Sequence, residues 1–144
     1  MLGKLFGGLR AVSDKAGGQE PLPDLIYVLL PEALDPIDRG EKYENPISFE
    51  LSRQSLGEIS GGGSQLGNEK PDGTSEIIFC GIDIDTYDVE TTRKLLHRVL
   101  PELGCLSGTQ VHYRSLNQPL LDEFDGVGWS LEKHREMLHP GFGI

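Results

Sequence analysis

The chain has 144 residues, a formal net charge of −10 at pH 7 and an isoelectric point near 4.7. This length is that of one ordinary domain with one hydrophobic core. The acidic balance argues against nucleic acid and anionic lipid as partners, because phosphate contacts need clustered Lys and Arg, and it favours a basic protein. Cys80 and Cys105 are too few for a disulfide framework, so we expect buried thiols in a reducing cytoplasm.

The first 20 residues combine a short apolar stripe with a spacer that contains Gly17 and Gly18 and is followed by Pro21 and Pro23. Four apolar residues share one helical face and predict an amphipathic helix: Leu2, Leu5, Phe6 and Leu9. This helix is expected to dock on its own domain or on a neighbouring subunit, with a membrane-surface anchor as the disfavoured alternative. No run reaches the length of a membrane span, so no membrane partner is expected. We predict a single domain over 1–144, with an N-terminal segment and spacer over 1–20 and a C-terminal extension over 119–144.

The first strand is predicted at Asp24–Leu30, a continuous apolar run typical of the middle of a sheet. Residues 31–44, rich in charge and containing Pro36 and Gly40, are expected to form an exposed connection with about one helical turn. A helix is then predicted from Pro46 to Ser55.

Asn45 and Pro46 are typical of a helix start, and Gly57 sits where a glycine would end the helix. The alternation of Ile47, Phe49 and Leu51 leaves a strand as the alternative. Residues 57–67 are too rich in glycine for a central strand and predict an edge strand with a bulge. Turn residues at 68–73 join this strand to the next one as a hairpin.

Residues 76–86 predict the central and longest strand, since apolar residues recur at every second position. The face expected to meet the helices carries Ile78, Cys80, Ile82 and Ile84. The other face carries Ile77, Phe79, Asp83 and Asp85. A helix over 88–100 follows, with Asp88 as its cap and with Pro101 and Gly104 closing it, and its leucines cover the apolar face.

Residues 108–114 alternate polar and apolar side chains and predict a half-buried strand. Ser130 is the expected cap of a short helix over residues 131–138 that Trp129 folds back onto the domain. The resulting order is strand, helix, strand, strand, helix, strand. We therefore predict an α+β fold of the ferredoxin-like βαββαβ arrangement, an antiparallel sheet with helices on one face plus short N- and C-terminal helices.

The candidate site lies on the polar face of this sheet. Asp83 and Asp85 share a strand face, His112 lies on the polar face of another strand, and Glu58 is on the hairpin partner. Two carboxylates and an imidazole are sufficient for a metal or acid/base site, and the alternative is a solvated sheet face. With Arg114, these are the predicted binding residues. No catalytic residue, metal ligand or cofactor is predicted.

Three other sequence patterns are weaker candidates for a functional site. The run Gly61-Gly62-Gly63-Ser64 lacks the Lys and the following helix of a phosphate loop, so a strand irregularity is the better interpretation. His134 and His139 are five apart, which does not place them on one helical face. No G-x-S-x-G turn is present to activate a serine.

Several structural positions over residues 56–113 together resemble a pattern found in small bacterial α+β domains. They are the glycine run at 57–64, the turn at Asp72-Gly73, the strand end at 81–85, the helix end at 95–104 and Gly108-Thr109. Some domains with this pattern are immunity proteins of polymorphic toxin systems, and the resemblance implies that the chain binds a toxin.

Two functions from different classes follow from the sequence. The first is a non-enzymatic acidic protein-binding module, an immunity or inhibitor protein that occludes a basic partner. The rival is a metal-dependent or acid/base enzyme that uses the sheet face around Asp83, Asp85 and His112. The apolar N-terminal stripe and the edge strand further predict self-association as a dimer.

Overall fold

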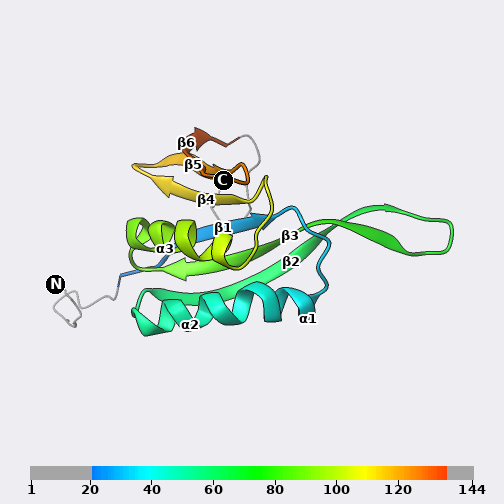
Figure 1. The fold of residues 1–144 in the computed structure, drawn as a ribbon, viewed down its shortest axis with the longest axis horizontal. Coiled ribbons are helices and arrows are strands. Elements are labelled where there is room, and N and C mark those ends of the chain that lie inside the picture. The colour runs from blue at the N-terminus through cyan, green and yellow to red at the C-terminus, as the bar shows by residue number, and fades with distance from the viewer. Residues whose placement is uncertain (1–20, 136–144) are drawn as a thin grey trace.

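The computed structural model describes residues 21–135, which form a six-stranded antiparallel sheet in the order β2-β3-β1-β4-β5-β6 (Figure 1). The strands are β1 (Asp24–Leu30), β2 (Gly57–Glu69), β3 (Ser75–Thr86), β4 (Gln110–Ser115), β5 (Gln118–Phe124) and β6 (Trp129–His134). The helical elements are α1 (Pro36–Arg39), η1 (Gly40–Glu44), α2 (Asn45–Arg53) and α3 (Val89–Glu102). The predicted α+β class and antiparallel sheet are confirmed, although the sheet has more strands than a βαββαβ arrangement supplies.

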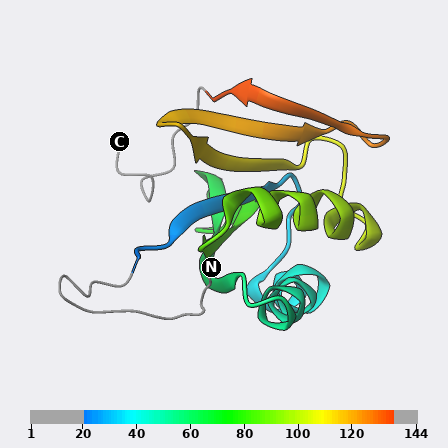
Figure 2. The same ribbon diagram turned by 90° about the vertical axis from the view of Figure 1, so that its left-hand side faces the viewer.

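The helices cover one face of the sheet, and the core lies between them and strands β1, β3 and β4 (Figure 2). Strand β1 lies in the middle, paired with β3 and β4, as its apolar run predicts. Its residues Ile26, Val28 and Leu30 are fully buried in this core. In the part of the chain that the structure describes, no helix has the length and apolarity to cross a membrane.

Strand β3 keeps the predicted register over most of its length. Cys80, Ile82 and Ile84 are fully buried, but Ile78 is 59% exposed, so the expectation that it faces the helices is wrong. The reason is that β1 pairs only with residues 80–86 of β3, whereas the earlier residues of β3 pair with β2 alone. The β2–β3 hairpin therefore extends as an arm beyond the helices (Figure 1). Strand β2, with 13 residues, is also longer than β3, with 12.

Strand β2 is the irregular edge strand that its glycines predict. Its pairing with β3 shifts register at three places, the first between Ile59 and Gly61. Gly57 begins this strand, so its predicted role as the end of a helix is wrong. A Cβ atom on Gly57 would lie 2.0 Å from the carbonyl oxygen of Asp85, and only glycine permits this approach.

The connection predicted at 31–44 is instead largely helical. The helix begins at Pro36, where the side chain of Asp35 accepts a hydrogen bond from the Asp38 N–H at 2.8 Å. It continues through the π-helical turn η1 into α2, so Asn45 lies inside the helix and is not its cap. Pro46 cannot donate a hydrogen bond, and the wider turn before it, with the Asn45 N–H donating to the Gly40 carbonyl, accommodates this loss.

The bounds of helix α3, Val89–Glu102, are close to the predicted range of 88–100. The Asp88 side chain accepts from the Thr91 N–H at 3.0 Å and caps the helix. Pro101 lies within the last turn, so it does not close the helix as expected. The apolar side of the helix is buried in the core, through Leu95, Leu96, Val99 and Leu100.

The C-terminal helix predicted over 131–138 is wrong in its described part, because residues 129–134 form strand β6. The Asp125 side chain accepts hydrogen bonds from the N–H groups of Val127 and Gly128, which fixes a turn that brings β6 back along β5. Trp129 thereby packs on Phe124, with ring centroids 5.2 Å apart. The amphipathic segment over residues 2–9, the end of the predicted C-terminal helix and His139 lie outside the described residues.

Candidate functional site

The predicted site residues all belong to the sheet face opposite the helices, which carries no helix of residues 21–135 and which we call the helix-free face. Alternation places them there, since their strand neighbours, such as Ile82, Ile84, Val111 and Tyr113, fill the core. The site residues come from three strands: Glu58 on β2, Asp83 and Asp85 on β3, and His112 and Arg114 on β4. The residues therefore share one face of the sheet, as their strand positions predict.

The strand order does not bring all of these residues together. Tyr27 on β1 lies opposite Asp83 on one side and opposite His112 on the other. With neighbouring strands about 4.8 Å apart, this places Asp83 and His112 roughly 10 Å apart across the sheet. Among residues 21–135, no three His, Cys, Asp or Glu side chains are grouped so that they could hold a metal ion. The arrangement does not favour the acid/base trio considered from the sequence.

His112 is 1% exposed, although its strand pattern predicted a solvated position. Its ring packs edge-on against Tyr27, with centroids 5.5 Å apart, and its Nε2 lies 2.8 Å from Oε1 of Gln110. Gln110 in turn donates to Glu123 on β5 at 3.1 Å. His112 is thus a packed residue of the sheet, whereas Arg114 on the same strand is exposed.

Glu58 and Asp85 form a cross-strand pair of like charges, because the register of β2 and β3 sets them directly opposite each other. Within residues 21–135, neither carboxylate accepts a side-chain hydrogen bond or forms an ion pair. Like charges at such positions destabilise a sheet by about 0.2–1 kcal/mol. The pair therefore does not stabilise the fold.

A hollow on the same face adjoins Asp83 and occupies about 200 Å³. It is lined by Tyr27, Gly62, Gly63, Ser64, Gln65, Phe79 and Asp83. The Tyr27 ring lies across β3, so that a Cβ atom on Gly81 would be 2.2 Å from the Tyr27 hydroxyl oxygen. Burial, together with the charge of Asp83, raises the pKa of Tyr27 to about 12, so the phenol stays neutral at pH 7.

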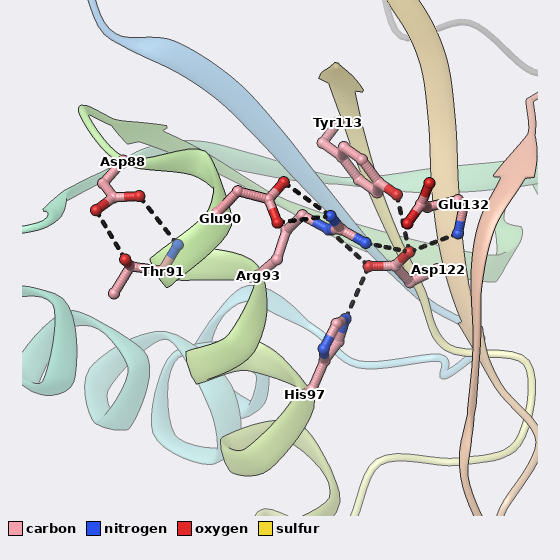
Figure 3. A network of polar contacts seen from close by, with 8 residues as sticks. All are labelled: Asp88, Glu90, Thr91, Arg93, His97, Tyr113, Asp122 and Glu132. Carbon is pink, nitrogen blue, oxygen red and sulfur yellow. Dashed lines mark hydrogen bonds and ion pairs between the residues drawn. The ribbon is translucent and has the colours of Figure 1, made fainter. Parts of the chain in front are cut away.

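The opposite, helix-covered face holds a polar network that the sequence analysis missed, centred on Asp122 of β5 (Figure 3). Asp122 is fully buried, and its Oδ2 lies 2.9 Å from Arg93 Nε and 2.7 Å from His97 Nε2. Its Oδ1 accepts from Arg93 Nη2 at 2.9 Å, from the Tyr113 hydroxyl at 3.0 Å and from the Glu132 N–H at 3.0 Å. Helix α3 is thereby tied to β4, β5 and β6.

Burial acts to raise the pKa of Asp122, but the hydrogen bonds from His97 and Arg93 outweigh it and hold this pKa at about 2. Tilted ring packing between His97 and Trp129, with centroids 4.9 Å apart, closes the network on one side. Arg93 lies 3.9 Å over the Tyr113 ring on the other. Both oxygens of Asp122 are fully used, so the network joins elements and offers no carboxylate oxygen for chemistry.

Two signals in the sequence point to this network. Arg93 and His97 are four residues apart, which puts them on one face of α3. Asp122 stands between Leu120 and Phe124 in the alternation of β5, at a position where an apolar residue would be expected. A charged residue at a core position predicts an ion-pair partner, but the sequence does not say which one.

Comparison of the chain with protein-family models, with curated proteins and with solved structures finds no match.

Proposed function

We propose that this chain is a non-enzymatic acidic protein-binding module that occludes a basic protein partner, as an immunity or inhibitor protein does. The observation that carries the proposal is the cross-strand pair of Glu58 and Asp85. Two carboxylates without a cation in the described chain weaken the sheet, and a basic group from a partner would turn this cost into attraction. With a net charge of −10, the whole chain would also steer a basic partner toward it.

An enzyme on the same face is less well supported. Acid/base or metal chemistry needs its groups within hydrogen-bond or coordination reach, and Tyr27 stands between Asp83 and His112. His112 is also engaged with Gln110 and almost fully buried. Both features favour binding of a partner by the helix-free face over catalysis on that face.

Three further proposals accompany this function. We infer that β1 to β4 with the two helices form a ferredoxin-like unit, supported by the order β2-β3-β1-β4, and that β5 and β6 extend it. The two cysteines are free and buried, which supports a reducing cytoplasm as the compartment. Dimerisation stays a prediction, since its main support lies outside the described residues.

The test of the function compares two charge reversals in the full chain. Asp85→Lys changes the proposed binding face, and Glu41→Lys makes the same change of charge at an exposed position on the helical side. Proteins captured from the source cell by the immobilised chain should include a basic protein whose association slows as salt rises. Its association rate should fall about tenfold or more for Asp85→Lys, and much less for Glu41→Lys.

Equal effects of the two reversals would mean that the helix-free face has no special part in binding. Capture of no basic protein, together with a metal-dependent activity that Asp83→Ala abolishes, would replace the proposal with the enzyme.

A further inference from the structure

The geometry points to a specific role for the hollow on the helix-free face: we propose that it receives an arginine side chain of the basic partner. This inference rests on the proposed function and adds to it the chemical group that is recognised. The hollow has the size of one side chain, is lined by polar and aromatic groups and lies beside the Glu58–Asp85 pair.

The hollow exists because Gly63 of β2 and Gly81 of β3 lie directly opposite each other, so neither strand supplies a side chain there. At Gly81 the missing side chain is explained by the overlying Tyr27. At Gly63 no such contact explains the missing side chain, since a Cβ atom there would meet no atom of residues 21–135 within 4 Å. Glycine at 63 leaves space that packing within the described chain does not use.

The neighbouring glycines differ from Gly63 in this respect. A Cβ atom on Gly61 would lie 3.2 Å from Oδ2 of Asp83, and one on Gly62 would lie 3.0 Å from Oε2 of Glu44. Both positions are crowded by the protein itself. Within the glycine run, Gly63 is the position where an added methyl group would enter the hollow without a clash with residues 21–135.

The walls of the hollow suit a planar cation. Asp83 contributes a carboxylate, Tyr27 a neutral hydroxyl that can accept a hydrogen bond, and Gln65 an amide oxygen. Phe79, opposite Gln65 in the register, contributes an aromatic ring. A guanidinium group stacks on aromatic rings and donates several hydrogen bonds in one plane, which matches this set better than the compact ammonium of lysine does.

Size and position agree with a single side chain as the occupant. At about 200 Å³ the hollow is smaller than the roughly 300–1,000 Å³ of small-molecule sites. Asp83 and Asp85 are two residues apart on one face of β3, so a partner surface that engages the Glu58–Asp85 pair also reaches the hollow. One arginine would then sit among several basic groups of the partner.

The test is an NMR titration of the full ¹⁵N-labelled chain with N-acetyl-arginine N-methylamide. The probe should cause saturable shifts of the Gly63 and Gly81 amides, and the neutral citrulline analogue should not. Gly63→Ala and Asp83→Asn should each weaken binding about tenfold or more. The control Asp85→Asn removes the same charge from the same strand and should change binding by only about twofold.

Unchanged binding to Gly63→Ala would overturn the proposal, because that variant places a methyl group in the hollow, where the guanidinium would lie, without a clash in the described chain. Equal binding of the citrulline analogue would exclude recognition of a cation, and tighter binding of the lysine analogue would exclude arginine as the occupant.

The two proposals can fail separately. If the captured partner discriminates Asp85→Lys from Glu41→Lys but binds Gly63→Ala as it binds the unmodified chain, the hollow has no part and the proposed function stands. If the arginine probe binds the hollow but no basic protein discriminates the two charge reversals, the hollow is an arginine site and the proposed function fails.

Discussion

Replacing Asp122 with Asn should destabilise the domain strongly, because this carboxylate joins α3 to three strands. The substitution keeps the shape of the side chain and removes its charge. Arg93, whose side chain is 7% exposed, then loses its buried counter-ion and keeps only Glu90, which is largely exposed. Breaking a buried pair from one side costs about 3–5 kcal/mol. Since the introduced carboxamide could still accept some of the hydrogen bonds, we expect a loss near the lower end, about 3 kcal/mol.

The pH dependence of the free energy of unfolding gives a second value for the stability that the Asp122 carboxylate contributes. Burial opposes ionisation of Asp122, but His97 and Arg93 hold its pKa at about 2, below the ordinary value of 3.8. A carboxyl pKa that is lowered in the folded state contributes stability above the unfolded value and loses it as the pH falls toward the folded value. The difference corresponds to about 2 kcal/mol, which should disappear between about pH 5 and pH 2.

Urea denaturation at pH 7, 5, 3 and 2 measures both quantities. Asp122→Asn should show the loss at pH 7 and a stability that falls less steeply with acid than that of the unmodified chain, by about 2 kcal/mol. Asp24→Asn, at an exposed position of β1, is the control and should stay within about 0.5 kcal/mol at pH 7. A loss below about 1 kcal/mol for Asp122→Asn, or the same acid dependence in both proteins, would refute this role of the Asp122 carboxylate.

Three further outcomes test the fold and the like-charge pair. Ile82→Asp should unfold the domain, since an unpaired charge would enter the core, whereas Ile78→Asp on the exposed arm should keep a cooperative melt; loss of both would contradict the register. Gly57→Ala should cost about 2 kcal/mol or more, because its Cβ atom would overlap the Asp85 carbonyl, and Gly63→Ala should be nearly neutral in the same urea assay. Glu58→Lys should raise stability by up to about 1 kcal/mol by pairing with Asp85, and a loss of stability would show that the two carboxylates do not interact.

The local sequence was sufficient to predict those helices and strands whose pattern and capping residues lie within the element itself. The alternation of Cys80, Ile82 and Ile84 predicts a strand with one buried face, and Asp88 with the apolar spacing after it predicts α3. The glycines of residues 57–67 predict an edge strand. These signals hold because backbone sterics, capping and side-chain period act over a few residues.

Elements whose state depends on distant partners were predicted wrongly. The helix begins at Pro36, ahead of the Asn45-Pro46 start signal, and it buries Tyr43 and Arg39. Residues 129–134 form a strand because β5 offers an edge and Trp129 finds a place between Phe124 and His97. Burial in a tertiary core outweighs local propensity in both cases.

For the candidate site, too, some features follow from the local sequence and others depend on the tertiary structure. The period of two by itself placed Glu58, Asp83, Asp85, His112 and Arg114 on one face of the sheet. Which of them are neighbours was decided by the strand order and register, which set Glu58 against Asp85 and inserted Tyr27 between Asp83 and His112. The hollow over Gly63 and the contacts of Asp122 also depend on residues far apart in the chain, because only tertiary pairing brings such residues within a few ångströms of one another.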